Sequence, residues 1–188
     1  MKIIETSIPG LLIIEPRVFA DQRGYFFESY NQQSLQEAGI SNLFIQDNES
    51  KSGRGVIRGL HYQLAPYAQA KLVRVIQGRV YDVAVDCRKG SPTFGQSFGL
   101  ELSEDNKLQF FVPKGFAHGF SVLSETAIFS YKCDQLYNPA AERGIRYNDP
   151  ALKINWGIDS SDAIVSGKDT ISPLFADAEM NFEYEAHD

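Results

Sequence analysis

Closely spaced strand patterns constrain the fold of this chain more than any other feature of its sequence. Runs rich in β-branched and aromatic residues occupy positions 71–76, 80–85, 98–102, 108–112, 119–123 and 126–133. Clusters such as Gly90-Ser91-Pro92 and Pro113-Lys114-Gly115 separate these runs, and residues of these types favour turns. Many short strands at such spacing are typical of antiparallel sheets that form a sandwich or a barrel.

Helical patterns are scarce along the chain. The best helix is predicted from Asn31 to Ala38, with Asn31 as the N-cap and Gly39 as the stop. Pro139 to Glu142 could form one short helical turn, because proline is tolerated at its start. From Asp149-Pro150 onward the chain becomes more polar, which favours a C-terminal wrap over a second domain. We therefore expect one all-β domain over residues 1–188.

Composition and charge narrow the class of protein. The chain has 188 residues, of which 43% are hydrophobic, so it can bury a core without a disulfide or a metal. Its 24 acidic and 18 basic residues give a formal net charge of −6, and it has no Lys/Arg run, which argues against a nucleic-acid partner. No apolar run approaches the length of about 18 residues that a membrane span requires.

The N-terminus and the cysteines indicate a cytoplasmic protein. The first residues, Met1–Ser7, are too short and too polar a stretch to form a signal peptide. Cys87 and Cys133 form no C-x-x-C motif and lie in apolar stretches. We expect two reduced, buried thiols, which are common in reducing compartments, although one disulfide is possible.

Two segments of the chain each contain a histidine in a distinctive spacing. The first reads Gly55-x5-His61-x-Gln63, followed by Lys71 with six residues between it and Gly78, and the second reads Pro113-x-Gly115-x2-His118. These segments resemble the sequence motifs of the cupin barrels, G-x5-H-x-H…E-x6-G and P-x-G-x2-H. In a metal-binding cupin, three histidines and the glutamate hold one cation. Here Gln63 replaces a histidine and Lys71 replaces the glutamate. Because an ammonium group repels a divalent cation and two histidines are too few for a tight site, we predict a pocket without metal.

A longer series of segments follows the chain in order: Asp21-x-Arg23-Gly24-x-Phe26-x-Glu28, Gln46-Asp47-Asn48, Arg58-Gly59-Leu60-His61-Tyr62-Gln63, Ala68-Gln69-Ala70-Lys71, Asp82-Val83-Ala84-Val85-Asp86, Gly115-Phe116-Ala117-His118, Tyr131-Lys132-Cys133 and Asn148-Asp149-Pro150. Together they resemble the dTDP-4-dehydrorhamnose 3,5-epimerase family over about residues 1–175, which leaves 176–188 as a C-terminal tail. The resemblance implies a cupin-type jelly-roll β-barrel with a few short helices. It also implies an isomerase that needs no cofactor.

The implied reaction inverts C3 and C5 of dTDP-4-dehydro-6-deoxy-D-glucose and gives dTDP-4-dehydro-L-rhamnose, a step towards dTDP-L-rhamnose. Both carbons are α to the C4 ketone, so each inversion needs a stabilised enolate, a base on one face and an acid on the other. A histidine suits the base because it titrates near neutral pH. The resemblance assigns His61 as the base, with Asp169 orienting its ring. Lys71 and Arg58 would hold the enolate oxygen, and Tyr131 would be the acid.

The same family resemblance assigns the remaining site residues to binding of the nucleotide. Arg23, Arg58 and Lys168 would surround the nucleotide. Glu28 and the segment Gln46-Asp47-Asn48 would recognise the thymine or hold the residues that contact it. Tyr137 would stack on the base, and His118 and Glu142 would complete the pocket. Family members pair as homodimers and lend N-terminal residues to the partner's site. This implies that Arg23 and Glu28 act across a dimer interface.

Three other functions stay open at the level of the sequence. A relative with the same barrel could epimerise only one carbon or isomerise the keto-sugar. The protein could also be a metal-dependent cupin such as an oxygenase, and a stoichiometric metal in protein purified without chelator would then contradict the argument from Lys71. A non-catalytic module that binds a sugar nucleotide would keep its binding, and would have no turnover to lose, when His61 is replaced by alanine.

Overall fold

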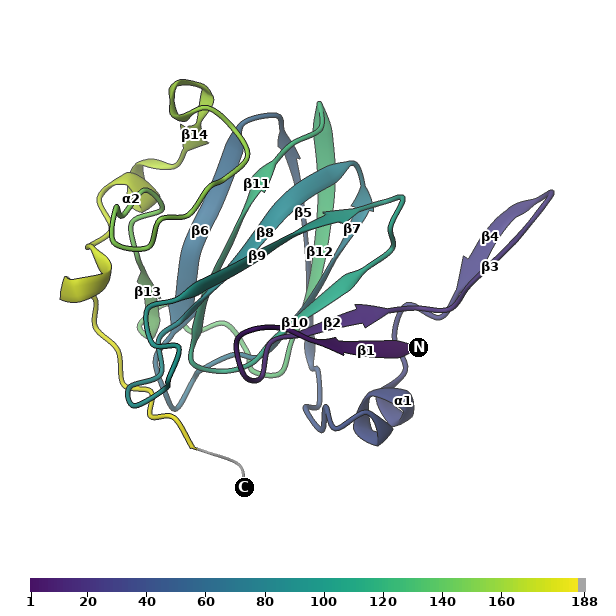
Figure 1. Ribbon diagram of the computed structural model, residues 1–188, viewed down its shortest axis with the longest axis horizontal. Coiled ribbons are helices and arrows are strands. Elements are labelled where there is room, and N and C mark those ends of the chain that lie inside the picture. Colours follow the sequence, from purple (N-terminus) through teal and green to yellow (C-terminus); the bar gives the residue numbers. More distant parts are fainter. Residues whose placement is uncertain (186–188) are drawn as a thin grey trace.

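The computed structural model describes residues 1–185, so the last three residues of the expected C-terminal tail lie outside the description. Two sheets dominate the fold (Figure 1). The first contains, in spatial order, β1 (Lys2–Glu5), β2 (Leu12–Glu15), β10 (Gln109–Val112), β7 (Lys71–Gln77), β12 (Thr126–Cys133) and β5 (Gln46–Gly53). The second contains β13 (Glu142–Gly144), β6 (Val56–Gln63), β11 (Phe116–Val122), β8 (Arg79–Asp86) and β9 (Ser97–Ser103), and β14 (Ile164–Val165) pairs with β6 in parallel.

Few elements lie outside these sheets. A hairpin of β3 (Val18–Asp21) and β4 (Gly24–Phe27) projects away from the two sheets (Figure 1). The helices are α1 (Gln32–Glu37) and α2 (Gly167–Thr170), with 3-10 turns at Ser160–Asp162 and Phe175–Asp177. None of the helices in residues 1–185 has the length and apolar character needed to cross a membrane.

The main core lies between the two sheets. Side chains two residues apart on a strand share a face, so alternate residues of each strand enter this core. They include Val73 and Val75 of β7, Val80 and Ala84 of β8, Phe116 and Phe120 of β11, and Ala127 and Phe129 of β12. Alternation along each strand therefore determines which side chains face the interior of the barrel.

The second sheet is buried on its outer face as well. Ile57 of β6 and Val83 and Val85 of β8 pack there against Trp156 and Phe182 of the C-terminal segment. Burial on both faces explains why the run 80–85 is almost continuously apolar. The C-terminal segment is also tied by its backbone, because the Lys89 amide donates to the Phe182 carbonyl at 2.9 Å. The expected C-terminal wrap is thus present.

The predicted secondary structure is largely confirmed. Each of the six predicted strand runs coincides with one of β7 to β12 to within one residue at the end where it extends beyond the strand, and β12 has the predicted bounds. Asn31 caps α1, its side chain accepting from the Ser34 amide at 3.1 Å. The helical turn suggested for Pro139 to Glu142 is wrong. The Ala141 amide closes a turn onto the Asn138 carbonyl, and Glu142 then begins β13, where pairing with β6 satisfies its backbone.

Candidate active site

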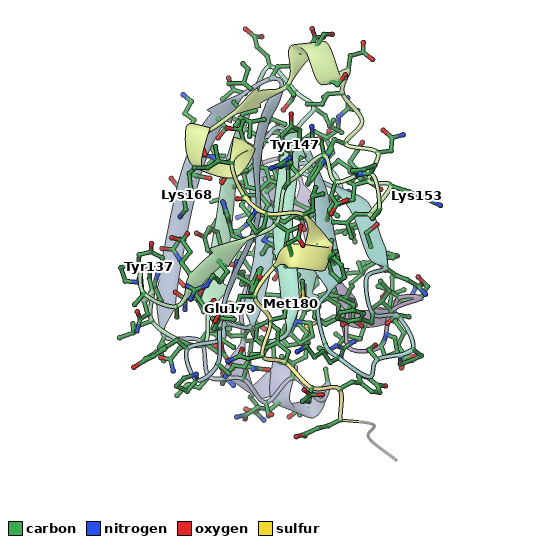
Figure 2. The ribbon with its side chains drawn as sticks, turned by 90° about the vertical axis from the view of Figure 1, so that its left-hand side faces the viewer. Tyr137, Tyr147, Lys153, Lys168, Glu179 and Met180 are labelled. Atoms are coloured by element: carbon green, nitrogen blue, oxygen red, sulfur yellow. The ribbon has the colours of Figure 1, made fainter. Side chains whose placement is uncertain are left out.

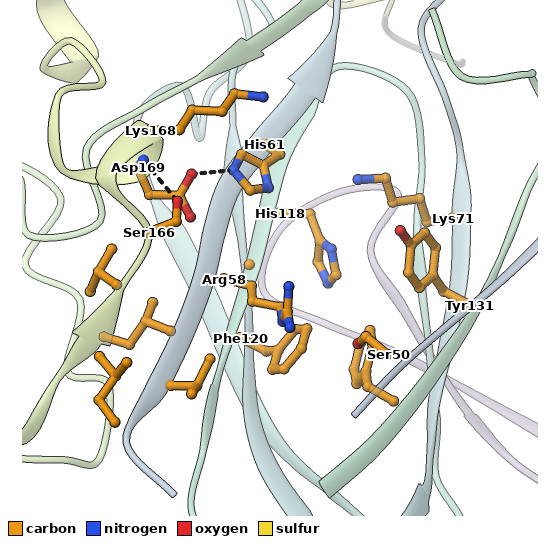
Figure 3. Close-up of a pocket in the computed structure, with 16 residues that line it drawn as sticks. Ser50, Arg58, His61, Lys71, His118, Phe120, Tyr131, Ser166, Lys168 and Asp169 are labelled. Carbon is orange, nitrogen blue, oxygen red and sulfur yellow. Dashed lines mark hydrogen bonds and ion pairs between the residues drawn. The ribbon is translucent and has the colours of Figure 1, made fainter. Parts of the chain in front are cut away.

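A cavity of about 430 Å³ opens between the two sheets. Its polar lining includes Ser50, Arg58, His61, Lys71, His118, Tyr131, Ser166, Lys168 and Asp169, and Phe120 and Phe129 form part of its apolar wall (Figure 3). A second cavity of about 260 Å³ shares His61, Lys71 and Tyr131 with the first. The two cavities therefore meet at three of the four residues predicted to be catalytic.

His61 and Asp169 form a short hydrogen-bonded pair at the cavity wall. His61 Nε2 lies 2.6 Å from Asp169 Oδ1, so Nδ1 is the ring nitrogen that faces the cavity (Figure 3). Burial alone would raise the pKa of the Asp169 carboxyl, but hydrogen bonding and charge from His61 hold it below its usual value. An ionised Asp169 accepts the Nε2 hydrogen, and this leaves the Nδ1 lone pair directed at the cavity.

The position of Asp169 is set by the start of α2. Ser166 is the N-cap of this helix, and its hydroxyl accepts from the Asp169 amide at 3.1 Å. Asp169 is almost completely buried. Two residues before α2 begins, Val165 pairs with Ile57 of β6, which holds the helix beside the strand that carries His61. The carboxylate is thereby fixed against the imidazole.

A β-bulge brings Arg58 to the same cavity as His61. These residues are three apart on β6, so a regular strand would place them on opposite faces. The pairing with β11 shifts between the pairs His118–His61 and Phe120–Arg58, and the extra residue in β6 restores a common face. Gly59 makes the bulge possible, because a Cβ at its φ of +129° would lie 2.5 Å from the Cα of Gly119.

Lys71 lies at the first position of β7 and contributes to both cavities. Burial is the largest influence on its amine and lowers the pKa, whereas Cys133, Asp82 and Glu142 raise it. The amine is thus held where an ammonium is poorly hydrated. Such a group gains from any anion that forms inside the cavity.

Tyr131 faces His61 from the opposite sheet. It belongs to β12 of the first sheet, whereas His61 belongs to β6 of the second, and its hydroxyl points into the cavity (Figure 3). Burial raises the pKa of the Tyr131 phenol, so the hydroxyl keeps its proton at neutral pH. The cavity therefore presents a proton acceptor on one wall and a proton donor on the other.

His118 is paired with a residue that sequence reasoning did not assign to the site. Its Nε2 lies 2.8 Å from Oδ1 of Asp82, which is completely buried. A signal for Asp82 existed in the sequence. On β8 it shares a face with Val80 and Ala84, and an acidic residue in the core-facing series of a strand requires a partner.

Polar residues around the second cavity are linked to one another. The Tyr137 hydroxyl donates to Glu142 Oε2 at 2.8 Å, and Lys168 Nζ lies 2.5 Å from the same oxygen. Gln46 and Asn48 line this cavity as well, and the Gln46 side chain accepts from the Tyr137 amide at 3.0 Å. Tyr137 and Lys168 lie on one side of the molecule (Figure 2).

Three predicted site residues lie outside both cavities. Arg23 is in the tight turn between β3 and β4, with its side chain 85% exposed and 2.6 Å from Asp21. Glu28 lines a separate cavity of about 270 Å³, to which Phe19 and Phe26 of the same hairpin also contribute. Asp47 faces away from its neighbours Gln46 and Asn48 because alternate residues of β5 face opposite sides, and it pairs with Lys132.

The donor atoms of the site do not form a metal-ligand group. Within residues 1–185, no three His, Cys, Asp or Glu side chains are placed to hold one metal ion. Cys87 and Cys133 are buried free thiols, and burial raises their pKa values to about 12 and about 11. Both thiols therefore remain protonated at neutral pH.

Comparison with known proteins yields a consistent set of relatives. The sequence profile described as dTDP-4-dehydrorhamnose 3,5-epimerase matches residues 5–177. The dTDP-4-dehydrorhamnose 3,5-epimerase of Shigella flexneri is 52% identical over 180 residues, which is 95% of this chain and 98% of the relative.

Two solved structures are similar along nearly the whole chain. The dTDP-4-dehydrorhamnose 3,5-epimerase of Elizabethkingia anophelis has 55% identity and a TM-score of 0.91, and the match covers 94% of this chain and 97% of that one. The dTDP-6-deoxy-D-glucose-3,5-epimerase of Legionella pneumophila was solved with dTDP-4-keto-L-rhamnose. It has 48% identity and a TM-score of 0.94, and the match covers 98% of this chain and 99% of that one. The predicted cupin-type β fold is confirmed by these neighbours.

Proposed function

The chain belongs to the dTDP-4-dehydrorhamnose 3,5-epimerase family, and we propose that His61 and Tyr131 carry out the proton transfers of its reaction. It is an isomerase of dTDP-rhamnose biosynthesis that converts dTDP-4-dehydro-6-deoxy-D-glucose into dTDP-4-dehydro-L-rhamnose. The observation that carries the assignment of roles is the opposition of the two groups. His61 lies on the second sheet and Tyr131 on the first, with the cavity between them.

Each inversion proceeds in two proton transfers. His61 Nδ1 accepts the proton from the carbon next to the ketone, and the electrons of the broken C–H bond move onto the C4 oxygen to form an enolate. The Tyr131 hydroxyl then donates its proton to the opposite face of that carbon, and the ketone re-forms. His61 is left protonated and Tyr131 deprotonated, so both groups must exchange protons with solvent before the next inversion.

Lys71 and Arg58 stabilise the enolate oxygen in this scheme. Both are cations that line the larger cavity beside His61. Arg58 is steered by Ser52, whose hydroxyl accepts from its Nε at 3.0 Å. Donors that are aimed in advance at a developing oxyanion contribute about 3–4 kcal/mol each in well-studied sites.

The second cavity would hold the nucleotide. Tyr137 is 52% exposed at its rim, where it offers a free aromatic face to the thymine. Gln46 and Asn48 supply amide groups, and Lys168 next to Glu142 supplies a cation near the pyrophosphate. His118 and Glu142 complete the walls of the two cavities.

We also infer a homodimer in which the β3–β4 hairpin reaches the partner. Arg23 and Glu28 do not line the cavities of their own chain, and the hairpin projects from the barrel (Figure 1). Phe19 and Phe26 on this hairpin are 51% and 69% exposed, a large apolar surface for an isolated two-stranded ribbon. Active protein that sediments as a monomer would overturn this inference.

A cytoplasmic location and a single-domain organisation complete the proposal. The free thiols of Cys87 and Cys133 are of the kind found in reducing compartments. The C-terminal segment packs on the same sheet that carries His61, which supports one folding unit over the whole chain.

Proton NMR in D2O tests the function and the roles together. With dTDP-4-dehydro-6-deoxyglucose, the wild-type protein should replace the hydrogens at both C3 and C5 by deuterium. His61→Asn should abolish both exchanges while the protein still binds dTDP. Exchange at one carbon would indicate a single-centre epimerase, and intact binding without any exchange in the wild type would indicate a binding module.

A further inference from the structure

Asp82 is the most buried charged group near the active site, and the reaction scheme above gives it no task. It lies on β8 among core residues and is completely buried. Oδ1 is 2.8 Å from His118 Nε2, but Oδ2 has no hydrogen-bond partner in residues 1–185, where it is the only buried side-chain nitrogen or oxygen without one. A carboxylate oxygen left in this state is costly and requires an explanation.

The Asp82–His118 pair lies directly behind the catalytic cavity. The His118 ring belongs to the cavity wall and stacks beside Phe129, with 6.2 Å between ring centroids and 27° between ring planes. Because Nε2 is engaged by Asp82, the ring orientation is fixed. His118 Nδ1 makes no hydrogen bond within residues 1–185. The carboxylate therefore holds one ring nitrogen and leaves the other available.

Lys71 lines the same cavity as His118, and its buried ammonium group needs an opposite charge nearby. The groups that face it are Cys133 and Tyr131 from β12, Asp82 from β8, His118 from β11, His61 from β6 and Glu142 from β13.

Among these groups, Asp82 is the best candidate for the counter-charge of Lys71. Burial raises the pKa of Cys133 to about 11, so this thiol is neutral at working pH. Glu142 is already bonded to Lys168 and Tyr137. Burial is the largest influence on the Asp82 carboxyl and raises its pKa, whereas the charges of His118 and Lys71 act in the opposite direction and favour the ionised form.

We propose that Asp82 is a positioning residue of the epimerase, which anchors His118 through Nε2 and keeps the ammonium of Lys71 charged inside the cavity. The proposal rests on the proposed function, because a charged Lys71 matters only if an enolate forms beside it. Asp82 itself need not touch substrate. It acts through the two side chains that do line the cavity, His118 and Lys71.

Asp82→Asn is the direct test, because asparagine keeps the shape and an acceptor for His118 but removes the charge. The readout is the pKa of Lys71, followed by NMR of protein labelled with ¹³C at lysine Cε and without substrate, with Lys71→Arg identifying the signal. We expect the pKa to fall by about one unit, since a nearby opposite charge shifts a pKa by one to three units. The high-pH limit of kcat should move down by the same amount, while dTDP affinity stays unchanged.

Asp86→Asn is the matched control on the same strand. Asp86 is also buried, but it is bonded to Arg88, Ser91 and Thr93, away from the cavity. This variant should lose stability without moving the pKa of Lys71. A folded Asp82→Asn protein with an unchanged Lys71 pKa would overturn the proposal, even if its kcat fell, because the loss would then be structural.

A second variant covers the case in which Asp82→Asn does not fold. Lys71→Met removes the cation, and the reciprocal effect must then appear as a higher pKa of Asp82, measured on its ¹³C-labelled carboxyl group. An unchanged Asp82 pKa would refute the coupling. The proposed function fails separately, because wild-type protein would then show no exchange at C3 or C5 whatever the two pKa values are.

Discussion

Asp169→Asn tests whether a buried carboxylate makes His61 a base. Asp169 Oδ1 lies 2.6 Å from His61 Nε2, and the side chain of Asp169 is only 5% exposed. Asparagine has almost the same shape but no charge. If its amide nitrogen faces Nε2, the imidazole hydrogen moves to Nδ1, and the nitrogen that faces the cavity can no longer accept a proton. If its amide oxygen faces Nε2, the imidazolium formed during reaction still loses its counter-charge.

The expected loss follows from the geometry of the pair. Two unit charges about 4 Å apart attract by about 4 kcal/mol at an effective dielectric constant of about 20. This attraction develops only when His61 becomes charged, so it lowers the barrier and leaves the binding of the ground state unaffected. We expect kcat to fall about 10³-fold. The affinity for dTDP should stay unchanged, because Asp169 does not line the second cavity.

The assay is the rate of deuterium incorporation at C3 and C5, measured by NMR, with calorimetry for dTDP binding. Asp177→Asn is the control, because Asp177 is an exposed aspartate in the same C-terminal segment and lines neither cavity. It should keep the wild-type rate. A folded Asp169→Asn protein that loses less than about tenfold in kcat would refute the reasoning, since general bases contribute at least 10²-fold in most enzymes.

Three further predictions concern stability, binding and pH. Gly59→Ala should lower the unfolding free energy, measured in urea, by more than about 3 kcal/mol, because the new Cβ would meet the Cα of Gly119. Gly39 also has a positive φ but lies in open space, so Gly39→Ala should cost about 1 kcal/mol. Equal losses would contradict the bulge argument. Tyr137→Ala should raise KM about tenfold with little change in kcat, as expected for a lost stacking contact, and an unchanged KM would remove Tyr137 from the site. For Asp86, burial would raise the carboxyl pKa, but hydrogen bonds from Arg88, Ser91 and Thr93 lower it. Its stabilising effect is therefore complete above the unfolded-state pKa of about 3.9 and is lost as pH falls through the lower folded-state pKa. Urea unfolding should show the stability gap between wild type and Asp86→Asn shrinking only below about pH 4; a gap that shrinks at higher pH would contradict this.

Local patterns in the sequence predicted much of the fold. Alternating apolar residues identified β7 to β12, and Asn31 and Gly39 marked the ends of α1. Strand β5 gave no such signal, because it is an edge strand whose side chains from Gln46 to Ser52 are all polar. Period-two alternation is a local property, so it can be read wherever one face of a strand is buried in apolar contacts.

By itself, the sequence determined the strand pattern and the cap of α1, and its ordered motifs predicted His61, Lys71, Tyr131 and Asp169 as site residues. Only the tertiary structure decided how they meet. His61 and Asp169 are 108 residues apart and come together because β14 and α2 pack along β6.

The tertiary structure also decided the β-bulge in β6 and the surroundings of the buried Asp82. The bulge at Gly59 puts Arg58 on the face that carries His61, against the period of the strand. The proposed role of Asp82 depends on His118 and Lys71, which lie on other strands. The physical reason is that distance, burial and charge are properties of pairs of residues, and pairs distant in the chain are set only when the sheets close on each other.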